Sequence, residues 1–140
     1  MTSVVVDASV IVACAIADGK ARRTLLAATG VEFYAPEYIL EEVRRRVPKI
    51  IALSGVAPAV LSSLYDDLFA RIAVVPRDGY RDLLEEATSL AGRAGAQGDE
   101  EYIALALALH APVWTYDKDF HRVRGIRVVS REQIELHRAD

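Results

Sequence analysis

Three β-branched residues in a row, Val4, Val5 and Val6, stand near the start of the chain and are followed directly by Asp7. An all-apolar run of this kind is typical of a strand that is buried on both faces of a parallel sheet. Parallel strands need crossover connections, and most of these contain a helix. The chain is therefore expected to alternate strands with helices. An aspartate directly after a buried strand also needs a specific reason to be there.

The rest of the sequence follows this alternation. Further strands are predicted at 32–34, 72–75, 113–115 and 127–129. Helices are predicted from apolar spacing at 8–17, 20–29, 36–51, 58–71, 80–91, 99–110 and 117–123. Pro48 is expected to kink or divide the third helix, 92–98 to be a flexible glycine-rich loop, and Ser130 with Gln133 to form the capping box of a terminal helix. The prediction is one α/β domain over residues 1–140, with a central, mainly parallel sheet flanked by helices.

Composition limits the class of protein. Of the 140 residues, 52% are hydrophobic, which is enough to build a core and excludes a disordered chain. The single cysteine excludes a disulfide framework and a cysteine-based zinc site. No apolar run reaches the roughly 18 residues of a membrane helix, and the first residues lack the basic segment of a signal peptide. We therefore expect a cytoplasmic protein without a membrane segment.

Acidic residues gather where an open α/β sheet places its chemistry, beyond the carboxyl ends of the strands. Asp7 follows the first strand, and Asp117 and Asp119 follow the strand at 113–115. Asp99 begins a helix beside the glycine-rich loop. Carboxylates from distant segments of the chain are thus expected to meet in one cleft.

A glutamate pair on the helix at 36–51 adds a further candidate. At about 100° per residue, Glu42 borders the apolar stripe of this helix, whereas Glu41 points nearly opposite to it. Glu42 is therefore the residue expected to reach inward, and Glu41 to lie on a solvated face.

Such a cluster of like charges needs a counter-ion or shared protons. Oxygen ligands select hard cations such as Mg²⁺ or Mn²⁺, which support phosphodiester cleavage by activating water. Simpler roles stay open for single residues. Asp99 could serve only the helix dipole and Asp117 only as a helix cap, and the glutamates could pair with Arg45 and Arg46.

Four segments carry motifs in a consistent order. They read VVVDASVIVA at 4–13, PEYILEEV at 36–43, DEEYIALA at 99–106 and VWTYDKDF at 113–120. Together they span essentially the whole chain and resemble the PIN-domain ribonucleases, and within them the VapC toxins of VapBC toxin–antitoxin pairs. Trp114 and Tyr116 are bulkier than the residues that often flank the fourth motif, and they are expected to narrow the cleft.

The resemblance implies the PIN-like fold and a metal-dependent endoribonuclease, the toxin of a type II toxin–antitoxin pair. Water attack on an RNA phosphate would leave 5′-phosphate and 3′-hydroxyl ends. The implied catalytic residues are Asp7, Glu42, Asp99, Asp117 and Asp119. Asp7, Asp99 and Asp117 would bind Mg²⁺ or Mn²⁺, with Asp7 and Asp99 as primary ligands and Asp119 as an auxiliary acid. Ser9 and Thr115 fall where the family often places a hydroxyl near the metal.

The resemblance also implies partners, namely an RNA substrate, a cognate antitoxin and a second copy of the chain in a homodimer. The net charge of −3 argues weakly against RNA binding, but it becomes +2 once the five site acids are counted as neutralised by metal. Basic residues in two clusters are candidates for phosphate contact, with Arg122 and Arg124 favoured over Arg44–Arg46. Two alternatives remain open: a PIN module that binds RNA or protein without cutting, and an RNA-processing nuclease without an antitoxin.

Overall fold

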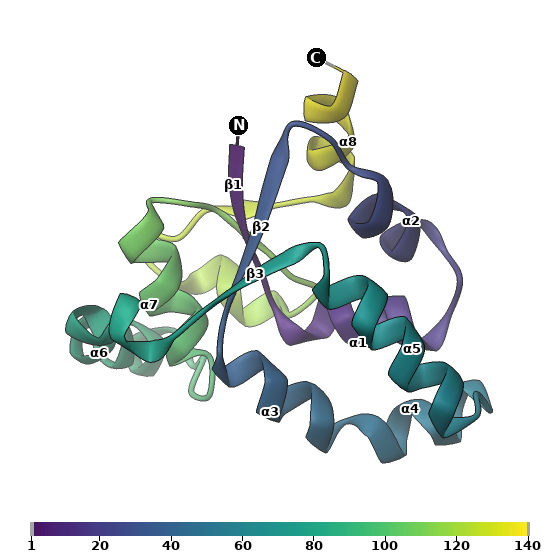
Figure 1. Cartoon of the computed structure of the whole chain (residues 1–140). Coiled ribbons are helices and arrows are strands. Elements are labelled where there is room, and N and C mark those ends of the chain that lie inside the picture. The colour runs from purple at the N-terminus through teal and green to yellow at the C-terminus, as the bar shows by residue number, and fades with distance from the viewer. Residues whose placement is uncertain (1, 140) are drawn as a thin grey trace.

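Five parallel strands form the centre of the computed structural model, which describes residues 2–139 (Figure 1). The strands are β1 (Thr2–Val6), β2 (Val31–Pro36), β3 (Ile72–Val75), β4 (Val113–Trp114) and β5 (Val128–Val129). Their order in the sheet is β3-β2-β1-β4-β5, so the valine run lies on the central strand, where it is fully buried. The predicted α/β class with a central parallel sheet is confirmed. The expected domain limits, residues 1 and 140, lie just outside the described residues.

Over residues 2–139, eight α-helices flank the sheet. They are α1 (Ala8–Ile16), α2 (Lys20–Ala27), α3 (Tyr38–Arg45), α4 (Val47–Ser54), α5 (Pro58–Phe69), α6 (Leu84–Ala94), α7 (Glu100–Leu109) and α8 (Arg131–Ala139). Three short 3₁₀ helices, η1 (Arg77–Gly79), η2 (Arg81–Leu83) and η3 (Lys118–Arg122), lie in the connections. Figure 1 shows α6 and α7 on one side of the strands and α1, α2 and α5 on the other.

The predicted helix at 36–51 is wrong in its limits. Pro36 belongs to β2, where it pairs with Val75, and α3 begins only at Tyr38. The segment then divides at Arg46, because Pro48 has no N–H to give a continuous helix and is tolerated only in the first turn of a new one.

The predicted helix at 80–91 is also displaced. The chain makes two 3₁₀ turns before α6 begins at Leu84, and α6 runs on through Gly92 to Ala94. The helix stops at Gly95, whose φ of 71° is in the left-handed region that glycine adopts freely. The glycine-rich loop is therefore shorter than expected and begins at Gly95. In contrast, the capping box is confirmed, since the Ser130 and Gln133 side chains each accept a hydrogen bond from the other's backbone N–H.

The core lies between the sheet and the helices. Tyr102, Ile103, Ala104, Leu105 and Ala106 of α7 are all buried, as expected for a helix covered on every side. A smaller cluster joins Ala15 of α1, Ile50 of α4 and Leu61 of α5. In the part of the chain that the structure describes, no single helix is long and apolar enough to cross a membrane. Taken together, α4 and α5 have the necessary length and composition but are bent by 114°.

The sheet topology creates one crevice at its carboxyl edge. From β1 the chain adds β2 and β3 on one side and later returns to add β4 and β5 on the other. Ligands of open α/β sheets bind at such a switch point. Val6 of β1 is paired with Trp114 of β4, so the next residues, Asp7 and Thr115, leave the sheet side by side.

Candidate active site

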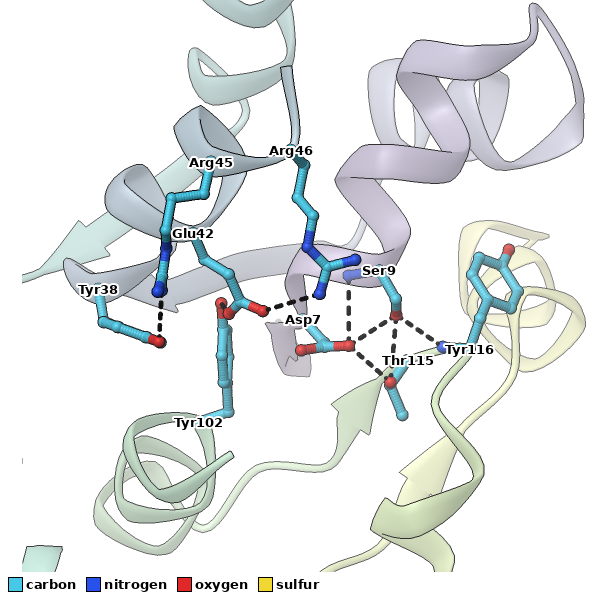
Figure 2. A network of polar contacts seen from close by, with 9 residues as sticks. All are labelled: Asp7, Ser9, Tyr38, Glu42, Arg45, Arg46, Tyr102, Thr115 and Tyr116. Carbon is cyan, nitrogen blue, oxygen red and sulfur yellow. Dashed lines mark hydrogen bonds and ion pairs between the residues drawn. The ribbon is translucent and has the colours of Figure 1, made fainter. Parts of the chain in front are cut away.

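Asp7 is the centre of a hydrogen-bond network at the switch point (Figure 2). Its Oδ2 accepts hydrogen bonds from Ser9 Oγ at 2.6 Å, Thr115 Oγ1 at 2.8 Å and the Ser9 backbone N–H at 3.3 Å. Within residues 2–139, its other oxygen, Oδ1, accepts none. The two hydroxyls predicted to lie near a metal therefore hold one oxygen of Asp7, and they leave its other carboxylate oxygen available to a ligand.

The environment of Asp7 disfavours its charge. The side chain is only 4% exposed, and burial raises its pKa. The hydrogen bonds from Ser9 and Thr115 oppose this rise, while the charge of Asp117 adds to it. Asp7 also caps the N-terminus of α1 through the Ser9 N–H. The carboxylate thus has a structural function, but this function uses only one of its two oxygens.

Glu42 faces Asp7 from α3, and Glu41 is exposed on the other side of the helix, as the helical spacing predicts. Tyr102 Oη donates a hydrogen bond of 2.7 Å to Glu42 Oε1, and Arg46 lies 3.5 Å from Oε2 (Figure 2). Burial raises the pKa of Glu42, whereas Tyr102 and Arg46 oppose that rise. Glu42 is therefore held from two sides, by a buried phenol and by an exposed cation.

Asp99 precedes α7 at the helix-cap position, yet its side chain makes no capping hydrogen bond. Glu100 instead accepts a hydrogen bond from the Gly98 N–H through both of its carboxylate oxygens, at 2.9 and 3.0 Å. Burial first, and then the charges of Asp7, Asp117 and Glu42, raise the pKa of Asp99 from 3.8 to about 8. A simple capping role does not account for this carboxylate.

Asp117 and Asp119 come from the segment after β4. Asp117 caps η3 by accepting the Asp119 N–H at 2.9 Å, so its alternative role as a cap is real. Asp119 forms an ion pair with Arg122, whose Nε also donates to the Ala94 carbonyl at 3.1 Å. Arg122, a candidate for RNA contact, is thus already engaged with η3 and the end of α6.

All five predicted carboxylates border one pocket of about 610 Å³, which we call the acidic pocket. Ser9 borders it too, whereas Thr115 stands behind Asp7 and Arg124 is not part of it. Further lining residues are Tyr38, Gln97 and Gly98, to which the sequence analysis assigns no role, and Arg45 and Arg46, which it offers as partners of the glutamates or as phosphate contacts. Tyr116 lines the pocket as expected, but Trp114 is buried and does not narrow it.

Tyr102 has no predicted role, whereas Arg46 is one of the arginines expected to pair with the glutamates of its own helix. Arg46 follows Glu42 by four residues, the spacing of neighbours on one helix face, and the two side chains lie 3.5 Å apart. The contact between Tyr102 and Glu42 joins two separate helices and has no such local signal. Arg45 donates to Tyr38 Oη at 2.6 Å and lies over its ring, so two arginines stand at the α3 side of the acidic pocket (Figure 2).

The donor set suits a hard divalent cation. After burial, the charges of the neighbouring carboxylates raise the pKa of Asp99, and a bound cation would relieve that repulsion. Among the side chains that the structure describes, no three acidic, histidine or cysteine groups are close enough to hold one ion between them. Mg²⁺ is compatible with this spacing, because it usually keeps several waters and takes only one or two protein carboxylates.

Comparison with known proteins gives one positive result. A search among curated proteins found no match. The family model described as PIN domain matches residues 5–139, which is nearly the whole chain.

Proposed function

The chain belongs to the PIN domain family, whose members are generally nucleases that use divalent metal ions, and we propose that it is a metal-dependent endoribonuclease. The observation that supports this most strongly is the meeting of Asp7, Glu42, Asp99, Asp117 and Asp119 around one pocket at the switch point of the sheet. A module that only binds would not need this repulsive cluster.

Asp7, Asp99 and Asp117 are the residues that would hold Mg²⁺ or Mn²⁺, one or two of them as direct ligands and the rest through the waters that such an ion keeps. When bound, such a cation would supply Lewis-acid stabilisation of charge on the phosphate and lower the pKa of water. Asp7 is preorganised for this role, because Ser9 and Thr115 fix one of its oxygens and leave Oδ1 without a partner in the described chain.

Glu42 is the residue that we propose to accept a proton from the attacking water. Its pKa is raised by burial, which makes it a better base than a solvated glutamate. Tyr102 fixes Oε1, and Oε2 faces Arg46 at 3.5 Å. Arg46 can then turn from Glu42 to the substrate phosphate. Attack by water leaves 5′-phosphate and 3′-hydroxyl ends, whereas cyclic phosphate ends would require attack by the ribose.

We also propose single-stranded RNA as the substrate and the toxin of a type II toxin–antitoxin pair as the biological role. Splayed single-stranded bases give access to the phosphodiester bond, and Arg45 and Arg46 supply positive charge beside the acidic pocket. Exposed apolar side chains on the outer helices, Leu26, Leu53 and Val60, are available for a second copy of the chain or an antitoxin.

The test is cleavage of an end-labelled single-stranded RNA panel with Mg²⁺, Mn²⁺ or EDTA. Asp7→Asn and Asp99→Asn are compared with the wild type and with Asp66→Asn, which changes an exposed aspartate of α5. We expect metal-dependent cutting that falls by at least about 100-fold in the two site variants only. Cutting in EDTA, or equal cutting by all variants, contradicts the proposal.

A further inference from the structure

A second groove adjoins the acidic pocket. It has a volume of about 360 Å³, within the roughly 300–1000 Å³ of small-molecule sites, and Tyr116 is the residue that borders both hollows. We call it the Tyr116 groove. Trp114, Tyr116, His121 and Arg131 are among its lining residues.

Tyr116 is exposed, but its position is fixed. Its ring is 51% exposed, and its backbone N–H donates to Ser9 Oγ at 2.9 Å, which in turn donates to Asp7. Its ring packs edge-on against Trp114, with centroids 6.4 Å apart. Figure 2 shows the Tyr116 side chain on the opposite side of Asp7 from Glu42. An accessible aromatic ring is therefore held at a defined place relative to the proposed catalytic carboxylate.

The chemistry of the groove matches a flat heterocycle. Tyr116 offers a ring for stacking, and base–aromatic stacking tolerates every base. Trp114 is fully buried at the border of the groove and supports the Tyr116 ring by edge-on packing. Base edges carry acceptor atoms. Arg131, which also pairs with Glu132, and His121 line the groove with N–H groups that can donate to such acceptors.

We propose that the Tyr116 groove binds one nucleobase of a single-stranded RNA whose neighbouring phosphodiester lies in the acidic pocket. This inference rests on the proposed nuclease function and adds a base subsite to it. The sharing of Tyr116 by both hollows favours this occupant, because a base in the groove and its phosphate in the pocket belong to one continuous strand.

The test measures RNA binding and cleavage for Tyr116→Ala and Tyr116→Phe. Binding is measured by fluorescence anisotropy with Mg²⁺ in an Asp99→Asn background, in which the RNA is expected to stay intact. We expect Tyr116→Ala to weaken binding about tenfold and Tyr116→Phe, which keeps the ring, less than about twofold. With Asp99 intact, Tyr116→Ala should raise KM about tenfold and leave kcat nearly unchanged.

A scan of abasic positions along the RNA locates the base. At one position, removal of the base should weaken binding to Tyr116 proteins about tenfold and have no effect on Tyr116→Ala. Trp114 is the only tryptophan of the chain, so quenching of its emission by RNA reports occupancy of the groove directly. Circular dichroism of each variant confirms that it is folded.

The outcomes separate the two proposals. If the wild type cuts RNA but Tyr116→Ala binds and cuts it equally well, the base subsite is wrong, the nuclease function stands, and the groove is left to a protein partner. The same holds if no abasic position depends on Tyr116. If the wild type neither binds nor cuts any RNA of the panel, the nuclease proposal fails and the subsite fails with it.

Discussion

Tyr102 is fully buried, and its hydroxyl donates a hydrogen bond to Glu42, which lines the acidic pocket. Tyr102→Phe keeps the ring but leaves Glu42 without this donor. We expect kcat for RNA cleavage to fall about tenfold, and the free energy of unfolding to fall by about 1–2 kcal/mol. Steady-state kinetics and urea unfolding check both values.

Tyr80→Phe is the matched control. Tyr80 is also buried, and its hydroxyl donates to Glu101 at 2.7 Å, away from the acidic pocket. The control should lose similar stability and keep its activity. Equal loss of activity in both variants would show that the Tyr102 hydroxyl acts only on stability.

The charge of Asp99 makes the stability of the metal-free protein depend on pH. With its pKa raised to about 8, the folded chain binds more protons than the unfolded chain between about pH 4 and pH 8. The free energy of unfolding contributed by this group therefore falls as pH rises through that range. In EDTA at pH 8, Asp99→Asn should stabilise the protein by about 1 kcal/mol, a value that allows for solvent screening. Thermal melts of the wild type and of Asp99→Asn at pH 5 and pH 8 test this. If the loss of stability between the two pH values is the same in both proteins, the prediction is contradicted.

Local sequence patterns identify the acidic residues of the site but not Tyr102, whose hydroxyl fixes the position of Glu42. Helical spacing distinguishes Glu42 from Glu41, and a lone acid after a buried strand stands out, so these residues are predictable. Tyr102 lies 60 positions from Glu42. That contact depends on how α7 packs beside α3, and a local pattern does not contain this information.

At the level of elements, Arg122 joins η3 to the end of α6. Its guanidinium pairs with Asp119 on η3 and donates to the carbonyl of Ala94, where α6 ends before the loop that leads to Asp99. In Arg122→Ala we expect amide hydrogen exchange over 95–99 to accelerate about tenfold, because the loop loses an anchor. Arg124→Ala is the control, since Arg124 is exposed and forms no hydrogen bond or ion pair within the described chain. Unchanged exchange in Arg122→Ala would leave Arg122 as a candidate for RNA contact alone.

Elements with strong local signals are predicted well and the others are not. α1, α5 and α7 have continuous apolar spacing, and their limits agree with the prediction within two residues. The errors at Pro36 and at Tyr80 have one cause. Pro36 pairs with Val75 and Tyr80 is bonded to Glu101, so partners distant in sequence decide the local conformation there.

For the whole molecule, stability depends on α7 between the sheet and α6. Leu105 is fully buried there, and Leu105→Ala should lower the free energy of unfolding by about 2–5 kcal/mol, through lost burial and a cavity. Leu136→Ala, at a side chain that is 70% exposed, should change it by less than about 0.5 kcal/mol. Urea unfolding of both variants measures the difference, and a cost below about 1 kcal/mol for Leu105→Ala would contradict this placement of the core.

The acids of the pocket lie far apart in the chain, so the site assembles late during synthesis. Asp117 is synthesised about 110 residues after Asp7, and β4 must then join β1 before Thr115 can reach Asp7. Synthesis proceeds at roughly 5–20 residues per second, so a nascent chain passes several seconds without an assembled site. On the proposed nuclease function, an unfinished chain that ends before β4 lacks this site and should not cut the RNA around it, including the message being translated.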